Sequence, residues 1–453
     1  MPETTVVVGG GLAGISAALR LADRGHQVTL LERRPRLGGR AFSFTRDGLQ
    51  IDNGQHVFLR CCSAYRWLLE RLDVTGETVL QERLDIPVLS PDGRSAHLTR
   101  SRGVPAPAHL GAALLRYRLL GLADRAGLGR AALALRRLDP ADRGLDERTL
   151  GDFLRAHGQS DRAIDALWGI IATATLNIGP DEASLALAAK VFRTGLLDSA
   201  PAGDVGYAAV PLGRLHDDAA AKALADAGVD VRLNHVARRI EPGLVEVEGP
   251  QHGTSTLRPS AIVLATPHPE AFIAAPTLAG SQASAAAGLG TSPIVNVHVV
   301  YDRRVTDLEF AAAVGSPVQW FFDRSASSGL AARSPLAQYL AITVSAADTT
   351  VTENNAKLTG RFVDELAALL PAARGAEVLD SFVTRESQAT FRQSAGSWPL
   401  RPGATDGPDG IWLAGAWTDT GWPDTMESAV RSGITAAEAA AGVSSGERLE
   451  LAL

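Results

Sequence analysis

The chain begins with a short run of β-branched apolar residues at 5–8, which is typical of a buried parallel strand. Residues 12–24 carry apolar residues at helical spacing, and Gly25 stands where such a helix would end. A second apolar run at 28–31 ends at Glu32. The pattern predicts a strand, a tight turn, a helix and a second strand, which is how a parallel α/β sheet opens.

The rest of the chain alternates between sheet-like and helical blocks. Residues 85–100 have the pattern of strands, and residues from about 104 to 200 are dominated by helical spacing. Alternating runs between 293 and 345 indicate an antiparallel sheet, with strands at 294–301 and 338–344. Further strands are predicted at 229–233, 244–247, 261–267 and 411–414, and a last helix from about 425 to 441.

This order predicts an α/β fold in which a Rossmann-type domain is assembled from discontinuous segments and an α+β substrate domain is threaded between them. A chain of 453 residues is long enough for two such domains. We assign residues 1–85, 205–285 and 396–445 to the Rossmann-type domain, and residues 86–204 and 286–395 to the substrate domain.

Charge and cysteine content narrow the function classes. A net charge of -6 without a long basic block gives no support for nucleic-acid binding. The only cysteines, Cys61 and Cys62, are sequence neighbours, so no disulfide framework is expected. No apolar run is long enough to span a membrane, and residues 1–10 do not have the pattern of a signal peptide. We expect a cytoplasmic protein.

The first turn carries the glycine spacing of a dinucleotide-binding loop. Gly9 permits the tight turn, Gly11 lets a diphosphate approach the backbone, and Gly14 lets the helix pack on the strand. The free N–H groups of the helix N-terminus, where about half a positive charge accumulates, would face the diphosphate. The residues predicted to contact it are Gly9, Gly11, Leu12, Ala13 and Gly14.

Glu32 lies at the end of the second strand, where a carboxylate can accept hydrogen bonds from both ribose hydroxyls. Its negative charge disfavours NADP, so FAD and NAD remain. The segment from Arg36 to Arg40 then adds the paired glycines Gly38 and Gly39 beside arginines, which gives a diphosphate a second close approach to the backbone.

This Glu-Arg and Gly-Gly-Arg pattern resembles the FAD-binding opening of the amine oxidase and carotenoid desaturase superfamily, and the resemblance favours FAD over NAD. In that superfamily the residue matching Arg40 lies along the pyrophosphate. The residues matching Glu32 and Arg33 hold the adenosine, and the residue matching Val236 contacts the adenine through its backbone.

A C-terminal block extends the resemblance. The superfamily uses a strand, a glycine turn and a helix to reach the flavin, and here these match residues 413–419 and 425–429. A helix N-terminus there would stabilise the anionic side of a reduced flavin. The resemblance implies cofactor contacts from Gly415, Thr425 and Met426, with the acidic residue that follows the glycine displaced to Asp419.

Three segments narrow the resemblance to the hydroxysqualene dehydroxylases, namely residues 52–56, 174–177 ahead of Pro180, and 420–423. This resemblance implies an FAD-dependent enzyme of squalene and hopanoid biosynthesis that reduces hydroxysqualene, an apolar prenyl lipid, to squalene. The reductant of the flavin is left open. Removal of an allylic hydroxyl needs an acid near the leaving oxygen and a dry pocket.

Residues 52–56 are expected to lie over the flavin. Asp52 and His56 are therefore the first candidates for the acid, and Gln55 and His56 are predicted to contact the cofactor. Two plainer interpretations stay open, because Asp52 would also suit a turn cap and His56 would also suit a flavin contact without proton transfer. Weaker candidates, equally suited to pocket lining or to core packing, are Asn177, Trp422 and Asp424.

Residues 104–138 interleave Leu, Ala and Val with six arginines. Such a segment suits a helix pair lying on a membrane surface, with arginines reaching lipid phosphates, or an ordinary surface helix pair with solvated arginines. We keep both interpretations, because an apolar substrate partitions into membranes and gives its enzyme a reason for peripheral contact.

Two other functions share this expected fold. A carotenoid or prenyl-lipid desaturase would use the same flavin site in the oxidative direction. A non-catalytic prenyl-lipid carrier would lack a working diphosphate site, whereas Glu32 and residues 36–40 are intact here. The sequence therefore favours the enzyme that reduces hydroxysqualene.

Overall fold

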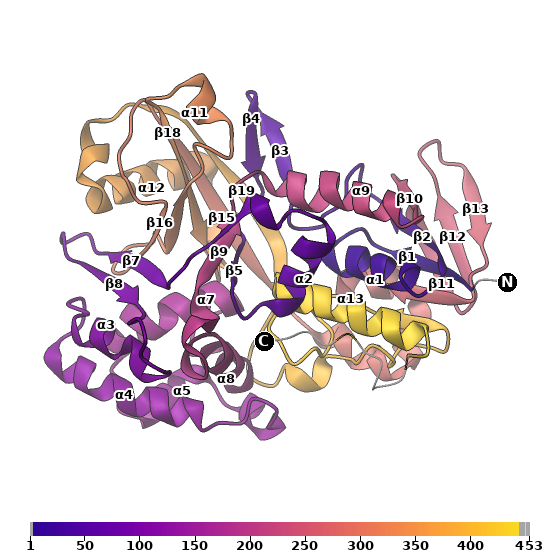
Figure 1. The fold of residues 1–453 in the computed structure, drawn as a ribbon, viewed down its shortest axis with the longest axis horizontal. Helices are drawn as coiled ribbons and strands as arrows, with labels where there is room; N and C mark the ends of the chain where they lie inside the picture. Colours follow the sequence, from indigo (N-terminus) through magenta and orange to yellow (C-terminus); the bar gives the residue numbers. More distant parts are fainter. Residues whose placement is uncertain (1–2, 444–448, 450–453) are drawn as a thin grey trace.

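The computed structural model describes residues 3–443 and residue 449, and it shows two bodies that share a long border (Figure 1). One body is built on a five-stranded sheet with the order β10-β2-β1-β14-β20, in which every neighbouring pair is parallel. Its strands are β1 (Thr4–Val8), β2 (Gln27–Glu32), β10 (Asp230–Leu233), β14 (Ala261–Leu264) and β20 (Ile411–Leu413).

The apolar strand runs form these elements because both faces of the sheet are covered. Val7 and Val263 are fully buried, as expected for central parallel strands. Helix α1 (Leu12–Ala22) packs against α13 (Met426–Ala440), and α13 packs in turn against α2 (Ser63–Arg71). Helix α1 also contacts α9, which spans Ala219–Asp226.

Beside this sheet lies a smaller antiparallel sheet of β11 (Val236–Glu241), β12 (Leu244–Glu248) and β13 (Thr254–Leu257), visible at the N-terminal end of the molecule in Figure 1. The short helix α10 (His268–Ala274) follows β14. The chain thus passes from β10 through the small sheet and back into β14 of the parallel sheet.

The second body is built on a seven-stranded sheet with the order β19-β15-β18-β17-β16-β7-β8, antiparallel except where β16 meets β7. Its strands are β7 (Asp85–Leu89), β8 (Ser95–Thr99), β15 (Thr291–Tyr301), β16 (Phe310–Ala313), β17 (Trp320–Asp323), β18 (Gln338–Val344) and β19 (Val378–Phe391). Helix α12 (Asn355–Leu369) buries Leu358, Phe362 and Leu366 against this sheet.

A helical lobe adjoins the seven-stranded sheet (Figure 1). It consists of α3 (Gly111–Leu115), α4 (Leu122–Arg136), α5 (Leu150–Ala156), α6 (Asp161–Ala163), α7 (Gly169–Leu176) and α8 (Leu185–Phe192). The remaining α-helix is α11 (Leu330–Arg333), and the remaining strands form the hairpin of β3 (Ser43–Arg46) and β4 (Leu49–Asp52) and the sheet of β5 (Val57–Leu59), β9 (Val205–Ala208) and β6 (Thr78–Leu80).

The predicted fold class is confirmed, because one parallel sheet collects strands that lie far apart in the sequence, with a separate helix-and-sheet body between them. The first helix is shorter than predicted. It ends at Ala22, and Gly25 lies in the following turn with a φ of 82°. The domain boundaries stay a prediction, and the predicted end at residue 445 lies outside the described residues.

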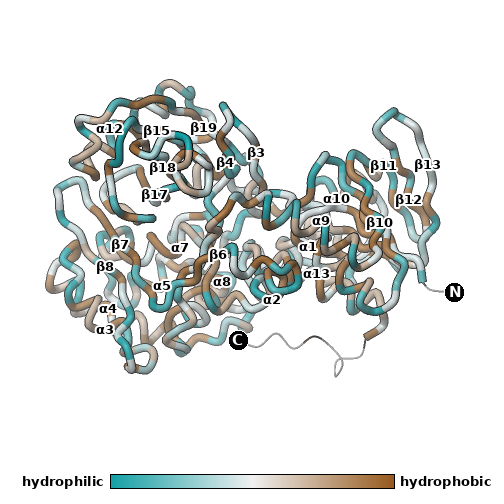
Figure 2. The backbone as a smooth tube through the Cα atoms, turned by 45° about the horizontal axis from the view of Figure 1, so that its top comes forward, coloured by the Kyte–Doolittle hydropathy of each residue, from teal (hydrophilic) through white to brown (hydrophobic). Residues whose placement is uncertain are grey.

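Hydrophobic stretches of the chain run through the interior of both bodies, while hydrophilic ones gather on loops and outer helices (Figure 2). Within residues 3–443, no helix is both long enough and apolar enough to cross a membrane. Helices α1 and α13 show how tightly the first body is packed, since a Cβ atom on Gly433 would lie 2.1 Å from the carbonyl oxygen of Ala13.

We therefore expect Gly433→Ala to force these two helices apart and to destabilise the protein by roughly 1–3 kcal/mol, the range of overpacked cores. Thermal and urea unfolding would measure the loss. Gly360→Ala in α12 is the matched control, because an added Cβ there meets nothing within 4 Å and a helical alanine is favoured. Equal stability of the two variants would contradict the close helix contact.

Candidate functional site

The first glycine turn closes where the carboxyl ends of β1 and β14 meet the start of α1. Gly9 has a φ of 111°, and a Cβ on it would lie 2.5 Å from the carbonyl oxygen of Ala265. A Cβ on Gly14 would lie 1.8 Å from the oxygen of Gly9. Only glycine fits either position. Gly11 forms the N-cap of α1 without a side-chain cap, which leaves the first-turn N–H groups, including those of Leu12 and Ala13, available to an anion.

The second glycine turn packs directly on the first. The N–H of Gly38 donates to the carbonyl oxygen of Gly10 at 2.9 Å. Gly39 has a φ of 59°, and a Cβ on it would lie 2.9 Å from the Cα of Gly11. Two backbone turns therefore line one short stretch of surface without side chains between them. Such a surface would let a diphosphate approach the backbone of both turns, and the contact itself stays a prediction.

Glu32 is buried beside these turns. Its Oε2 accepts from the N–H of Gly10 at 2.7 Å, and its Oε1 accepts from the N–H of Arg34 at 2.8 Å. Each carboxylate oxygen keeps a further lone pair for a ribose hydroxyl. The carbonyl of Glu32 accepts from the N–H of His235 at 2.9 Å, so Val236, the first residue of β11, lies at the same sheet edge.

The arginines of the motif separate into different roles. Arg36 lies 3.4 Å over the ring centre of Phe42 and donates to the carbonyls of Leu37 and Gly39, so it stabilises the second turn itself. Burial, with Arg34 nearby, lowers the pKa of Arg36 to about 10. Arg33 is half-exposed, 3.6 Å from Glu270. Arg40 instead reaches the second body.

Arg40 donates to the carbonyl oxygen of Ala389 in β19 at 3.3 Å. Burial lowers the pKa of His268, and the charge of Arg40 lowers it further. Burial raises the pKa of Asp424, and Arg40 partly offsets that effect. One oxygen of Asp424 accepts from the N–H of Phe391 at 2.8 Å.

The last strand, turn and helix meet the parallel sheet as the resemblance implies. Gly415 has a φ of 133°, and its N–H donates to Ser432 of α13 at 2.8 Å. Trp417 closes the turn by donating to the carbonyl of Thr266 at 2.9 Å. Thr425 is the N-cap of α13, and Met426, only partly buried, is its first residue.

Asp419 points elsewhere, which argues against the predicted cofactor contact. Its Oδ2 accepts from the indole N–H of Trp398 at 2.8 Å and lies 3.6 Å from Arg143, and its Oδ1 accepts from Gly421. It lines an outer cavity of about 280 Å³. Asp424, one of the weaker candidates from the sequence, accepts from Phe391 at the end of β19, the strand that Arg40 also contacts.

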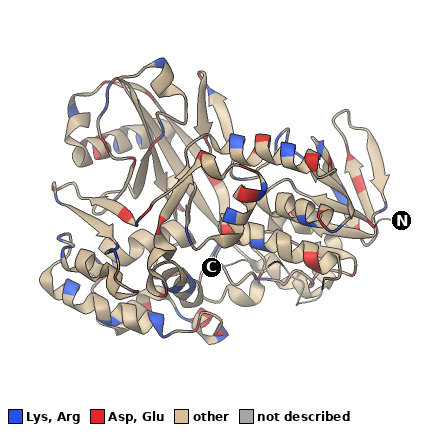
Figure 3. Cartoon of the chain, in the orientation of Figure 1, with Lys and Arg blue, Asp and Glu red and all other residues tan. Residues whose placement is uncertain are grey.

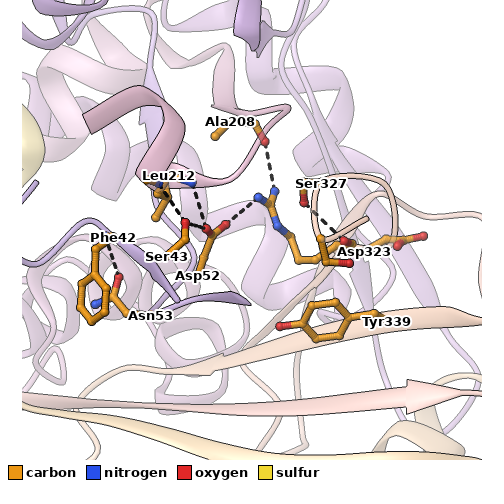
Figure 4. Close-up of polar contacts among 12 residues, drawn as sticks. Phe42, Ser43, Asp52, Asn53, Ala208, Leu212, Asp323, Ser327 and Tyr339 are labelled. Atoms are coloured by element: carbon orange, nitrogen blue, oxygen red, sulfur yellow. Dashed lines mark hydrogen bonds and ion pairs between the residues drawn. The ribbon is translucent and has the colours of Figure 1, made fainter. Parts of the chain in front are cut away.

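Asp52 is buried in a network that joins the two bodies (Figure 4). Its Oδ1 accepts from the hydroxyl of Ser43 at 2.6 Å and from the N–H of Leu212 at 2.9 Å. Its Oδ2 accepts from the guanidinium of Arg324 at 2.7 Å, and Arg324 also donates to the carbonyl of Ala208. Both oxygens of this carboxylate are engaged by these partners, so the contacts favour a positioning role.

The residues after Asp52 are held in place by hydrogen bonds from side chains of the second body. The carbonyl of Asn53 accepts from Asn296 at 2.9 Å and from Thr384 at 3.2 Å. A Cβ on Gly54 would lie 3.6 Å from Nε2 of His56, so the ring folds back over this turn. Burial lowers the pKa of His56, with Asp52 and Arg324 acting in opposite directions, and this keeps the imidazole neutral at neutral pH.

Unpaired buried groups in this region would suit hydrogen bonds to a ligand. Nε2 of Gln55 and Oγ1 of Thr266 are buried without a hydrogen-bond partner among the described residues. Such atoms are rare in folded proteins unless water or a ligand pairs them. Together with the two glycine turns and Glu32, they fit a dinucleotide that runs from Glu32 past Arg40 toward residues 54–56.

Comparison with known proteins agrees with this geometry. The sequence model of the flavin-containing amine oxidoreductases matches residues 12–441. The chain belongs to this family. It is therefore a flavin-dependent oxidoreductase, and the predicted superfamily is confirmed.

Among the relatives of this amine oxidoreductase is a hydroxysqualene dehydroxylase of Rhodopseudomonas palustris, 29% identical over 97% of this chain and 98% of that protein. A zeta-carotene desaturase of Zea mays is 26% identical over 94% of this chain and 81% of that protein. A solved cyclohexylamine oxidase of Brevibacterium oxydans shares the fold, with a TM-score of 0.69 and 18% identity over 98% of this chain and 99% of that one.

One site residue of this amine oxidoreductase carried no recognisable sequence signal, and two weaker candidates from the sequence have structural contacts. Arg324 stands in no motif, and its role follows only from its contact with Asp52. Asn177 is a C-cap with a φ of 50°, and its side chain bonds Ser292, Thr390 and Ala346, so its role is structural. The ring of Trp422 is buried, with Lys190 and Arg431 on it.

Removing the charge of Asp52 tests the network. We expect Asp52→Asn to lower the free energy of unfolding by roughly 3–5 kcal/mol, since it leaves Arg324 buried without its anionic partner. Denaturant unfolding would measure the change. Asp92→Asn, which breaks an exposed pair with Arg94, is the control and should leave the transition in place. If both variants unfold alike, the buried pair does not stabilise the border.

Proposed function

We propose that the protein is an FAD-dependent reductase that converts hydroxysqualene to squalene. The observation that carries the proposal is the end-to-end likeness to hydroxysqualene dehydroxylases, at 29% identity for one and at 27% over 97% of this chain for that of Sinorhizobium fredii. The intact glycine turns and Glu32 support a dinucleotide, and hence FAD in preference to a flavin without adenosine.

The residues that would hold FAD divide along its length. Glu32 and the backbone near Val236 would take the adenosine, while both glycine turns, the start of α1 and Arg40 would take the diphosphate. The turn at Gly415, the N-terminus of α13 and residues 54–56 would lie at the flavin ring. When bound, the reduced flavin supplies the hydride that replaces the hydroxyl group.

The chain itself must supply a proton, because the hydroxyl leaves as water. The ion pair with Arg324 removes Asp52 from this role, so we assign it to His56, which has no hydrogen bond to the described residues and lies on the turn that Asp52 fixes. Asp52 acts through this turn as a positioning residue. Exclusion of water would fall to the apolar walls of the second body.

A desaturase of carotenoids or related prenyl lipids is the second candidate, favoured by the likeness to zeta-carotene desaturases over more than nine-tenths of the chain. It would remove a hydride from an apolar polyene through the same flavin site. A non-catalytic lipid carrier is less well supported, since the glycine turns and Glu32 remain arranged for a diphosphate and a ribose.

Single-turnover chemistry separates the two reactions. We expect the reduced holoprotein, mixed anaerobically with hydroxysqualene, to yield one squalene for each flavin oxidised, measured by gas chromatography and by the return of flavin absorbance. Gly39→Val is the control, because its side chain would collide with Gly11 and leave the protein without flavin or product. A flavin that stays reduced beside unchanged hydroxysqualene would refute the proposal, and turnover of a polyene by the oxidised protein would favour the desaturase.

The proton assignment predicts a pH profile. Burial lowers the pKa of His56 from its ordinary value of 6.5. The protonated ring therefore becomes abundant only as the pH falls below 6.5. We expect kcat for squalene formation to rise toward acid over this window. His56→Gln should lower kcat by roughly 10²–10⁴-fold and flatten the profile, while the flavin spectrum stays unchanged. An unchanged profile in that variant would remove His56 from the proton step.

A further inference from the structure

A basic pocket lies apart from the flavin region, between strand β8 and helix α3. It has a volume of about 370 Å³. Its lining residues are Arg83, His97, Thr99, Arg100, Ser101, Ala112, Ala113 and Arg116. Three guanidinium groups therefore converge on one small space with hydroxyl donors beside them, which is an arrangement suited to a phosphate group.

The charge of this pocket is largely uncompensated. Arg83 and Arg116 are exposed, and neither side chain has an ion pair or hydrogen bond within the part of the chain that the structure describes. Arg100 is bound through Nε and Nη2 to Asp204, which leaves Nη1 for a ligand. Asp85, the acid nearest His97, is already paired with that ring at 2.7 Å.

Exposed leucines lie next to the pocket. Leu115, the neighbour of Arg116 at the end of α3, is 70% exposed, and Leu122 at the start of α4 is 79% exposed. Their helices α3 and α4 contact each other, and Arg125 of α4 donates to the carbonyl oxygen of Leu115 at 2.5 Å. Large apolar side chains so open to solvent are costly and mark a contact surface when they cluster.

Helix α4 has two apolar faces, and only one is covered. Leu128, Ala131 and Leu135 are buried against the lobe. Leu122 and Leu133 lie eleven residues apart, about three helical turns, so they share the opposite face, where Leu133 is 47% exposed. A surface helix normally turns a polar face to water. This one presents a leucine-bearing stripe.

Arginines flank that stripe. Residues 104–138 contain six arginines and a single acid, Asp124, whose carboxylate accepts from Ser160 at 2.7 Å. Basic segments mark this lobe in Figure 3. Apolar residues between arginines form the surface of an interfacial helix, with leucines in the acyl boundary and guanidinium groups at the phosphates.

We propose that this face docks on a membrane, and that the pocket of Arg83, Arg100 and Arg116 holds the phosphate of an anionic phospholipid. The adjoining leucines decide for a lipid over a soluble phosphate compound, because only a lipid places acyl chains beside its phosphate. The inference goes beyond the proposed reaction and does not depend on it. Vesicles without substrate suffice to test it.

The test is sedimentation of the full chain with phosphatidylcholine vesicles that contain or lack phosphatidylglycerol. We expect binding to the anionic vesicles that weakens as salt is added. Each arginine at an anionic surface contributes about a fivefold factor, so R83Q/R116Q should lower the partition coefficient roughly 25-fold. L115S/L122S should also weaken binding. The control is K357Q/R374Q, which removes one exposed charge in α12 and one in the segment after it. This variant should bind as the parent does.

Three results would overturn the proposal. The first is equal binding of the parent and R83Q/R116Q, and the second is binding that ignores phosphatidylglycerol or salt. The third is a protein that binds glycerol 3-phosphate in calorimetry but does not bind the vesicles. That result would assign the pocket to a soluble phosphate ligand. If R83Q/R116Q has a lower Tm than the parent, the proposal is tested instead by the salt dependence of the parent and by the vesicle binding of L115S/L122S. Bound flavin would be checked by absorbance in every variant.

Discussion

The contact between two glycine turns is the constraint on which the site depends. Gly11 and Gly39 approach so closely that a Cβ on Gly39 would lie 2.9 Å from the Cα of Gly11. The turns follow adjacent parallel strands, whose register brings both to one edge of the sheet. Ala265, at the end of the next strand, closes on Gly9. A surface made of backbone N–H groups can bind a diphosphate without a desolvated cation at its centre.

A second constraint places this surface relative to the reacting side. The buried pair of Asp52 and Arg324 links the β3–β4 hairpin to the segment that follows β17 in the second body. Burying both charges is costly, so such a pair contributes less to net stability than to a unique arrangement of its neighbours, which we infer is its use here. What it fixes is the turn that carries Gln55 and His56.

The sequence was most informative where one local segment determines the structure. The glycine spacing, the strand runs and the end of β2 at Glu32 predicted the parallel sheet and its first turn correctly. They could do so because local sequence determines backbone conformation and burial in these elements. Asp419 and Asp424 show the limit. Both follow the same glycine turn, but Asp419 accepts from Trp398 and Asp424 accepts from Phe391, and both partners are distant in sequence. Arg324 was missed for the same reason.

The fold alone does not set the direction of the chemistry, since dehydroxylases, desaturases and amine oxidases share it. The difference lies in protons. Replacing a hydroxyl with hydride consumes a proton as water leaves, whereas desaturation releases one. A group beside the reacting carbon must then be an acid in the first reaction and a base in the second. A protonated His56 would serve as the acid and a neutral His56 as the base, while Asp52 is paired with Arg324. We infer that the protonation state of this one imidazole, more than the flavin site, distinguishes the two reactions.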